Sequence, residues 1–512
     1  MKIIALKFNK IKKLAAKKRF ICFAAGKTLN DICIEYNIEN NIDFIADNNK
    51  SLWDKEIRLG NSKKVVKIIN PDKINELYTK NHVLIITTPY HMQVTDQLYE
   101  LKNDNIIEVY YFPVASDYTA GFYKKLYKNR PLKNIISFRS GALLYVKDLD
   151  FTDNARVLFE YMLKNGYNKN YKLVWYVKYP NKYKNYFKNH NVVFVSYDWV
   201  ESFNPYKKFL YWYFLFNSKF FFFTDTAFWT RYCYHDQIRV NLWHGCGFKD
   251  RKNKLANNGK SYEIMTVTSS VYAKIHARAF GLNDNQVIIT GLAKQDLLFN
   301  PPKQELDELL KIKKTKKNIF WLPTFRMAVS CLSALNEYYL PSEIGLPIIM
   351  NDSQMRELDD KLNEFNISLI IKLHPVQDNS VISHNIYKNI YIMDNSVILE
   401  KNLLINTLLS KADALISDYS SAAVDYMLLD RPIAFTLDDA EDYKKSRDFV
   451  FENLLDWLPG KEIYTFSDFI EFINEINEDI DSSADKRRKL LKDMHTYQDG
   501  NNCKRILDYF KI

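Results

Sequence analysis

The stretch DALISDYSSAAVDYMLLDRP, residues 413–432, reads as a buried strand that runs through a short turn into a helix. ALIS is the strand, DYSS is the turn, and AAVDYMLLD opens the helix. A strand followed directly by a helix is the unit from which parallel α/β sheets are built. Ser420 and Ser421 then lie at a helix N-terminus, where backbone N–H groups and the helix dipole attract anions. The alternative is a plain serine cap.

Strand patterns of the same kind extend on both sides of this stretch. The nearer set comprises NIFWLPT, SLIIKLHP, NIYIMD and PIAFTL, and an earlier set comprises NIISF, YKLVWYV, NVVFVS and KFFFFTD. Helical patterns separate most of these strands, so we predict two α/β halves, residues 131–300 and residues 301–512. Two doubly wound halves place a ligand in the cleft between them, at the carboxyl ends of their strands.

A smaller α/β unit is predicted ahead of the two halves. RFICFAAG, IDFIADNN and HVLIITT read as strands with a helix between the first two, which predicts a Rossmann-like module over residues 21–120. Its AAGKT string is not a P-loop, because Ile21 stands where that motif needs glycine. A small ligand near Gly26 and Asp47 is one interpretation, and a purely structural module is the other.

Residues 1–20 form a basic segment whose apolar residues recur on one helical face. Such an amphipathic helix can lie on an anionic membrane, and the alternative is a solvated helix or a frayed terminus. The aromatic stretch at residues 206–223 likewise reads either as a core helix and strand or as a surface that dips into lipid headgroups. Polar residues break its apolar run short of the ~20 residues that span a bilayer.

Composition limits the function classes. Of 512 residues, 47% are hydrophobic and 26% are charged, which excludes a disordered, collagenous or disulfide-scaffold chain. The net charge of +11 suggests an anionic partner, but no nucleic-acid-binding motif is present, so no nucleic acid is expected. Six scattered cysteines without a CxxC pair fit reduced thiols in a cytoplasmic protein. No signal peptide is visible.

Two histidines follow strand patterns, one in each half. IRVNLWH ends at His244, and catalytic groups of α/β proteins collect at such strand ends. Gly245 and the glycine two positions later allow the backbone to approach a ligand closely, while Lys249 adds positive charge. IIKLHPV puts His374 in the matching position of the other half. A structural role is the alternative for each histidine, yet the pair suits acid–base chemistry beside a phosphate.

Arg326 ends the string FWLPTFR, a strand that leads into a loop. Arginine binds phosphate in a forked geometry, and an ordinary surface ion pair is the alternative. Asp418, in the turn after ALIS, could orient a catalytic group or a hydroxyl-bearing ligand. No cluster of carboxylates has ligand spacing, so no metal site is expected. The absence of GxSxG, HExxH and kinase motifs argues against a hydrolase or a kinase.

Taken in chain order, the segments WHGCGFK, GLAKQD, PTFR, HP and SDYSS…RP resemble the motifs of the CDP-glycerol glycerophosphotransferase family, the teichoic acid primases and polymerases. The resemblance covers roughly residues 134–498. It implies a GT-B fold, with two Rossmann-like halves facing a cleft, here preceded by the small module. It also implies that a glycerol-phosphate or ribitol-phosphate unit passes from its CDP-activated form to a hydroxyl of a growing chain, with release of CMP.

The resemblance implies that His244 and His374 are the essential histidines, and that Arg326, Ser420, Ser421 and Asp418 lie around the CDP-linked donor. From this and from the chemistry of the residues, we expect His244, His374 and Asp418 to be catalytic. The expected substrate contacts are Gly245, Lys249, Lys294, Arg326, Ser420, Ser421 and Arg431. His244 is expected to act as the general base. Fixed cations and N–H groups would neutralise the charge on the diphosphate, so these residues require neither Mg²⁺ nor a cofactor.

Two departures from the family pattern concern the His244 motif and the GLAKQD motif. Cys246 and Gly247 replace a Thr-Pro pair, and Ala293 and Lys294 replace a Pro-Arg pair. The choice of acceptor, and even of the transferred polyol, therefore stays open. Cys246 invites a nucleophile interpretation, but direct transfer needs no protein nucleophile.

The expected partners are a CDP-polyol donor, a lipid-linked or polymer acceptor of the teichoic acid or capsule type, and the inner membrane surface, contacted peripherally from the cytoplasm. A GT-B glycosyltransferase or a nucleotide-sugar epimerase is the enzyme alternative. A scaffold that binds anionic polymers through its positive charge is the non-enzyme alternative. A homo-oligomer is compatible with the sequence, which leaves open both the oligomeric state and the choice between primase and polymerase.

Overall fold

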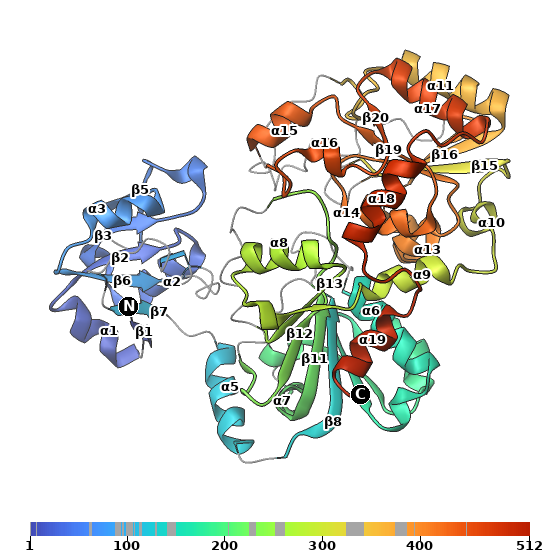
Figure 1. Ribbon diagram of the computed structural model, residues 1–512. Coiled ribbons are helices and arrows are strands. Elements are labelled where there is room, and N and C mark those ends of the chain that lie inside the picture. The colour runs from blue at the N-terminus through green and yellow to red at the C-terminus, as the bar shows by residue number, and fades with distance from the viewer. Residues whose placement is uncertain are drawn as a thin grey trace. The chain divides into compact units, whose positions relative to one another are not determined.

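The computed structural model describes all residues except 1, 7, 61–63, 88–93, 95–96, 99–105, 107, 112–114, 129–130, 141–149, 203, 225–231, 251–261, 324–341, 374–386, 394 and 447. The chain divides into two compact units, Met1–Lys128 and Asn129–Ile512. Figure 1 labels many of the helices and strands of both units. The described strands form three sheets that are almost entirely parallel, which confirms the predicted α/β class.

The first unit contains a seven-stranded sheet in the order β1-β7-β6-β2-β3-β5-β4. Its strands are β1 (Lys2–Ala5), β2 (Arg19–Phe23), β3 (Ile42–Ala46), β4 (Glu56–Arg58), β5 (Val65–Ile69), β6 (His82–Ile86) and β7 (Glu108–Tyr111). Its described helices include α1 (Phe8–Ala15), α2 (Lys27–Tyr36), α3 (Ile74–Leu77) and α5 (Ala115–Leu126). Ala25 N donates to Asp47 Oδ2 at 2.8 Å, so the turn after β2 meets the end of β3.

The basic segment at residues 1–20 differs from its predicted form. Lys2–Ala5 is strand β1, which pairs in parallel with β7, and the helix α1 is correspondingly short. Leu6 and Ile11 are fully buried in the core of this unit, while Lys12 and Lys13 stay exposed. Those apolar side chains of the segment that the structure describes pack in or against the core of the same unit. The segment is therefore not a free amphipathic helix that could lie on a membrane.

The second unit begins with a seven-stranded parallel sheet in the order β10-β9-β8-β11-β12-β13-β14. Its strands are β8 (Lys133–Ser140), β9 (Lys172–Val177), β10 (Val192–Ser196), β11 (Ser218–Thr224), β12 (Ile238–Asn241), β13 (Ile264–Val267) and β14 (Val287–Ile289). Its described helices include α6 (Asp153–Lys164), α7 (Pro205–Asn217), α8 (Ser270–Phe280) and α9 (Asp296–Phe299). We call this part the first half of the unit.

The second half contains a six-stranded parallel sheet in the order β17-β16-β15-β18-β19-β20. Its strands are β15 (Lys317–Trp321), β16 (Ile367–Lys372), β17 (Ile390–Met393), β18 (Ala414–Ser417), β19 (Ile433–Thr436) and β20 (Lys461–Ile463). Its described helices include α10 (Leu306–Leu310), α11 (Asp352–Phe365), α12 (Asn395–Glu400), α13 (Ile405–Leu409), α14 (Ser421–Tyr426), α15 (Ala440–Ser446), α16 (Leu454–Trp457), α17 (Phe466–Asn477) and α18 (Ala484–Met494).

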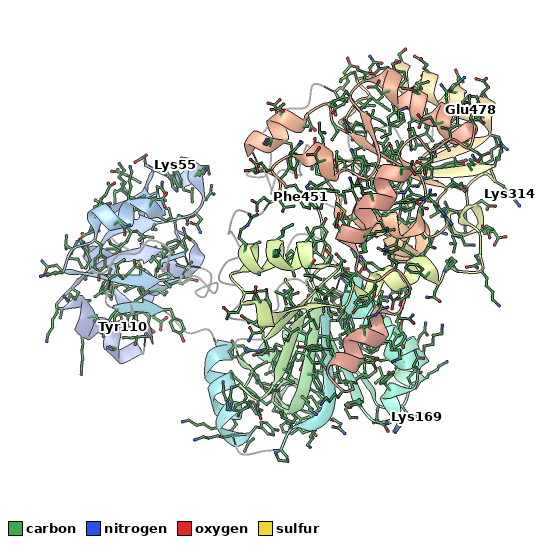
Figure 2. The ribbon with its side chains drawn as sticks, viewed as in Figure 1. Lys55, Tyr110, Lys169, Lys314, Phe451 and Glu478 are labelled. Atoms are coloured by element: carbon green, nitrogen blue, oxygen red, sulfur yellow. The ribbon has the colours of Figure 1, made fainter. Side chains whose placement is uncertain are left out.

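One apolar core joins the two halves of the second unit. Phe248, Tyr272 and Leu292 of the first half belong to the same buried cluster as Tyr419 of the second. Phe451, labelled in Figure 2, stacks on Trp457 with ring centroids 4.1 Å apart and meets the Tyr272 ring edge-on. This shared core holds together the two loops on which the site is built.

The last helix, α19 (Asn502–Tyr509), returns to the first half. Cys503, Ile506 and Leu507 pack in the same core as β8 and α6, and Figure 1 shows α19 (red) beside α6. Both oxygens of Asp296 accept backbone hydrogen bonds from the start of α19, each at 2.8 Å. The carboxylate thus satisfies N–H groups that the helix itself leaves without partners.

The aromatic stretch at residues 206–223 is mainly core. Tyr211, Trp212 and Phe216 of α7 are fully buried, which confirms the interpretation of a buried helix followed by a strand. The start of α7 is different, because Tyr206 is 66% exposed and Phe209 is 37% exposed. None of the helices in the described part of the chain combines the length and hydropathy that a bilayer crossing requires.

His495 predicts a pH dependence of folding stability. It is 2% exposed, and its Nε2 lies 2.7 Å from the carbonyl of Val424 in α14, so Nε2 carries the proton. Desolvation lowers its pKa below the ordinary value of 6.5, against the smaller opposing effects of that carbonyl and of Asp425. As the pH falls through that ordinary value, the unfolded chain binds the proton first, so acidification destabilises the folded chain.

The test compares the wild type with His495→Gln, whose amide keeps a donor for the Val424 carbonyl but does not titrate. Between about pH 7.5 and about pH 5.5, the melting temperature of the wild type should fall further than that of the variant. Differential scanning calorimetry at both pH values measures the two shifts. Equal shifts in the two proteins would contradict the assignment.

Candidate active site

His244 lies just beyond the carboxyl end of β12 and is half-buried. Trp243 before it has a φ of 50°, in the left-handed region that bulky residues rarely adopt. Its N–H donates to Asn241 Oδ1 at 2.8 Å, and its ring centroid lies 3.9 Å from that of His244 and 4.6 Å from that of Phe280. These contacts hold the strained backbone and set the direction in which the histidine leaves the strand.

Two side chains hold the carbonyl groups around His244. Asn154, near the start of α6, donates from Nδ2 to the Trp243 carbonyl at 2.8 Å. Its Oδ1 accepts from the backbone N–H of Lys294 at 2.9 Å, and Lys294 Nζ donates to the His244 carbonyl at 2.5 Å. Asn154 and Lys294 are both buried. The backbone of His244 is therefore tied on both sides.

Lys294 also forms an ion pair that connects the two halves. Its Nζ lies 3.0 Å from Asp425 Oδ2, and the exposed fractions of the two side chains are 11% and 1%. Gln295 Nε2 donates to the other oxygen of Asp425 at 2.7 Å. Desolvation lowers the pKa of Lys294, but attraction to Asp425 and Asp153 outweighs it and the net shift is upward. In the structure Lys294 is thus a buried, charged group held by protein partners, and the expectation that it contacts a substrate phosphate stays a prediction.

The turn after His244 lies directly on the N-terminus of α14. A Cβ added at Gly245 would lie 2.4 Å from Ser421 Oγ and 2.8 Å from Ser421 Cβ, and one at Gly247 would lie 3.0 Å from the same Cβ. Glycine permits this approach because it has no Cβ. Ser420 caps α14 by accepting a backbone hydrogen bond at 3.3 Å, as the alternative interpretation expected. The structure thus brings the histidine turn and both serines together.

Asp418 and Lys249 lie near the same turn. Asp418 directly follows β18 and is fully buried. The next residue, Tyr419, donates its hydroxyl to Asp439 Oδ1 at 2.9 Å, and its ring centroid lies 4.3 Å from that of Tyr443. Lys249 Nζ lies 5.8 Å from the centroid of the same Tyr443 ring. The shared aromatic contact keeps Lys249 among the site candidates.

The structure does not bring Arg431 to this site. Arg431 precedes β19 at the amino edge of the sheet, whereas Asp418 follows β18 at the carboxyl edge. Its Nη1 donates to the backbone carbonyls of Ser410 and Ala412. The chain has returned to the opposite edge of the sheet at Arg431, so the expected substrate contact stays a prediction without support from its position.

Two further expected residues, Arg326 and His374, lie outside the described residues, so their roles stay predictions. The strands that lead to them, β15 and β16, are parallel neighbours, and β15 also pairs in parallel with β18. Both strands therefore end at the same sheet edge as the DYSS turn. In the part of the chain that the structure describes, no group of three or more His, Cys, Asp or Glu side chains is arranged to hold a metal ion.

Cys246 is a core residue. It is 1% exposed and packs in the cluster that joins the halves, together with Phe248 and Ala423. Burial raises the pKa of its thiol to about 12, despite hydrogen bonding to Thr268. The thiol is therefore protonated at neutral pH, and a protonated buried thiol is a poor nucleophile. The substitution of the family's Thr-Pro pair by Cys-Gly fills the core and lets the turn approach α14.

Sequence reasoning missed three supporting residues, Asn154, Gln295 and Asp425. Asp425 lies four positions after Ser421 in α14, a spacing that places both on one helix face, and this was the one available signal. Gln295 adjoins Lys294 within the GLAKQD motif. Asn154 carried no signal, because its contacts with the His244 turn exist only in the folded chain.

The two parallel α/β sheets of the second unit, with strand ends meeting at one site, define a GT-B-type protein. The chain belongs to the CDP-glycerol:poly(glycerophosphate) glycerophosphotransferase family, whose sequence pattern matches residues 131–511. This confirms the resemblance found in the motifs. The first unit, Met1–Lys128, lies entirely outside the matched residues.

Two curated relatives are similar to this chain over about half of their own length. The teichoic acid glycerol-phosphate primase of Bacillus subtilis (strain 168) is 32% identical over 252 residues, 49% of this chain and 58% of that protein. The teichoic acid ribitol-phosphate polymerase TarL of Staphylococcus aureus (strain NCTC 8325 / PS 47) is 29% identical over 284 residues, 52% of this chain and 46% of that protein. The chain thus spans about half the length of these relatives.

The fold also matches solved structures. A variant of the wall teichoic acid polymerase TagF, soaked with CDPG, superposes with a TM-score of 0.59 at 20% identity. The match covers 82% of this chain and 97% of that chain. The GT-B-like prediction of two Rossmann-like halves is therefore confirmed at the level of the fold.

Proposed function

We propose that this chain transfers a polyol phosphate from a CDP-linked donor to a hydroxyl of a teichoic-acid-like or capsular polymer, releasing CMP. Glycerol phosphate is the preferred candidate for the transferred group. The observation that carries the proposal is the contact between the His244 turn and the N-terminus of α14, formed by two of the family's motifs. It sets a candidate base from one half against a candidate phosphate contact from the other. Attack on a phosphoryl group needs that juxtaposition.

In the proposed reaction, the acceptor hydroxyl oxygen attacks the phosphorus that carries the polyol. A P–O bond to the acceptor forms, the bond from that phosphorus to the bridging oxygen breaks, and the bridging oxygen leaves on CMP. His244 accepts the hydroxyl proton, and the ordinary pKa of histidine suits a base that works near neutral pH. The ties on its backbone would hold the imidazole in place before substrate binds.

The charge that develops on the diphosphate is assigned mainly to groups of the second half, with Lys249 added from the first half. Ser420 and Ser421 supply hydroxyl and backbone N–H groups at the start of α14, and Lys249 supplies a cation nearby. Arg326 and His374 complete the set through their motifs. On this proposal the reaction proceeds without added Mg²⁺.

The identity of the polyol is proposed from the relatives. The primase of Bacillus subtilis is named for glycerol phosphate and TarL is named for ribitol phosphate, so both CDP-polyols belong in the test. Glycerol phosphate is preferred because the primase has the higher identity, 32% against 29%.

We propose peripheral contact with the cytoplasmic face of the membrane through the start of α7. Tyr206 and Phe209 expose aromatic surface there, and Lys207 between them is also exposed. Aromatic side chains beside lysine favour the interface of an anionic bilayer. Residues 1–20 are not assigned this role, since their described apolar side chains pack in or against the core of the first unit.

The test measures CMP release from CDP-glycerol and CDP-ribitol by the full chain, with membrane extract as the acceptor source and a panel of sugar nucleotides alongside. One arm contains EDTA. The proposal predicts acceptor-dependent CMP release from a CDP-polyol in both arms. Turnover of a sugar nucleotide with no turnover of either CDP-polyol would overturn it in favour of GT-B sugar chemistry. Loss of activity only in the arm that contains EDTA would overturn the claim that the reaction needs no Mg²⁺, but not the proposed transfer itself.

A further inference from the structure

The ammonium group of Lys294 connects the His244 turn to helix α14, whose relative positions matter for the proposed reaction. On one side it donates to the His244 carbonyl at 2.5 Å, and on the other it lies 3.0 Å from Asp425 Oδ2. Asp425 lies one helical turn beyond Ser421 in α14. A single buried ammonium group therefore links the backbone of the histidine to the helix that starts with the serine.

We propose that Lys294 and Asp425 form a positioning pair, which sets His244 at a fixed place relative to the start of α14. The catalytic part of this inference rests on the proposed function, because it takes His244 as the base and Ser421 as a donor contact. Neither member of the pair touches substrate on this account. Each acts through the group that it holds.

Burial makes the pair an effective linkage. The exposed fractions of the two side chains are 11% and 1%, so removing one charge leaves the other buried without its ionic partner. The remaining contacts strengthen the arrangement on both sides. Gln295 Nε2 holds the second oxygen of Asp425 at 2.7 Å, and Asn154 accepts from the Lys294 backbone while it holds the Trp243 carbonyl. Movement of α14 is thereby transmitted to the histidine turn.

The rival role for Lys294 is direct binding of a donor phosphate. The two roles predict opposite kinetic signatures. A phosphate contact supports donor binding, so its loss raises the dissociation constant of the CDP-polyol, and loss of Asp425 would free the lysine to bind the donor more tightly. A positioning pair supports geometry, so loss of either member lowers kcat and leaves donor binding unchanged.

The kinetic test uses Lys294→Met, Asp425→Asn, the double variant and Lys294→Arg. Each single variant should lower kcat about 100-fold, the loss expected when a reacting group is displaced by about 1 Å. The double variant should lose no more than the singles, since either change already breaks the linkage. Lys294→Arg keeps both the charge and the donors and should recover at least about 10-fold of the loss. Calorimetry should give one donor dissociation constant for all of the proteins.

Lys317→Met is the matched control. The Lys317 side chain is similarly buried, at 14% exposed, and it also holds a backbone carbonyl and a carboxylate, those of Ile476 and of Asp479, whose own side chain is 76% exposed. It lies at the start of β15, at the edge of its sheet opposite to the site. The control should therefore lose stability without losing kcat, which separates positioning from a general loss of folding.

Hydrogen exchange gives a readout that does not depend on transfer activity. Amides at residues 242–248 should exchange faster in Lys294→Met and Asp425→Asn than in the wild type or in Lys317→Met. Unchanged exchange there, or an increased donor dissociation constant with kcat retained, would overturn the positioning role. If neither the wild type nor any variant turns over a CDP-polyol, the proposed function fails. The exchange result then still decides whether the pair holds the histidine turn.

Discussion

His244→Ala is expected to lower acceptor-dependent CMP release about 10³-fold, within the range that a general base contributes. The reason is geometric. The imidazole follows β12 at the carboxyl edge of its sheet, is half-buried, and leaves a backbone that Asn154 and Lys294 hold on both sides. The strained backbone of Trp243 costs conformational energy, and such strain is typical of functional sites rather than of a histidine with only a packing role. Steady-state kinetics with CDP-glycerol measures the loss.

Donor binding should survive this substitution, since the donor contacts are assigned mainly to the other half. Isothermal titration with CDP-glycerol should therefore give similar dissociation constants for His244→Ala and the wild type. His190→Ala is the control, because His190 is exposed beside β10, outside the site, and should keep full activity. Retention of wild-type turnover by His244→Ala would contradict the assignment of the base.

Gly245→Ala is expected to lower activity about 100-fold, through displacement of the histidine turn from α14. The added methyl group would lie 2.4 Å from Ser421 Oγ and 2.8 Å from Ser421 Cβ, both shorter than any normal contact. Rotation of the serine hydroxyl relieves the first clash but cannot move the Cβ. The turn must shift, so we also expect a loss of about 1–3 kcal/mol of folding stability, typical of overpacking. Activity assays and denaturant unfolding measure the two effects.

A second substitution identifies the clash as the cause. Ser421→Gly removes both atoms that the methyl group would meet, so it should restore stability when combined with Gly245→Ala. Gly121→Ala is the control, because a Cβ there meets nothing within 4 Å in α5. It should leave activity unchanged. If Gly245→Ala were as stable and active as the wild type, the contact between the turn and α14 would not exist in solution.

The parts of the fold that are visible in the sequence are those with local signals. The strand ALIS, its DYSS turn and the following helix were predicted because an apolar run passes directly into a helical pattern. The same logic placed His244 at the end of β12. Strand β1 had no such signal. Its residues belong to the sheet only because they pair with β7, far along the chain.

The site could be predicted only as far as strand ends determine it. Ser421 and Gly245 were singled out from opposite halves, and the structure brings them into contact. The ion pair of Lys294 with Asp425 could not be predicted, because the two residues meet only when the two halves pack together. The distance of Arg431 from the DYSS turn was not foreseen, because a motif that spans a helix returns to the other edge of the sheet. Side-chain pairing across halves has no sequence pattern of its own.

The bond of the donor that breaks distinguishes transfer of glycerol phosphate from transfer of glycerol alone. The full chain is incubated with CDP-glycerol labelled in the glycerol and with a membrane acceptor, and the nucleotide product and the labelled polymer are both quantified. We expect one CMP to be released for each glycerol phosphate incorporated, because the acceptor oxygen attacks the phosphorus that carries the polyol. Release of CDP, with glycerol joined to the acceptor without its phosphate, would contradict the proposed transfer.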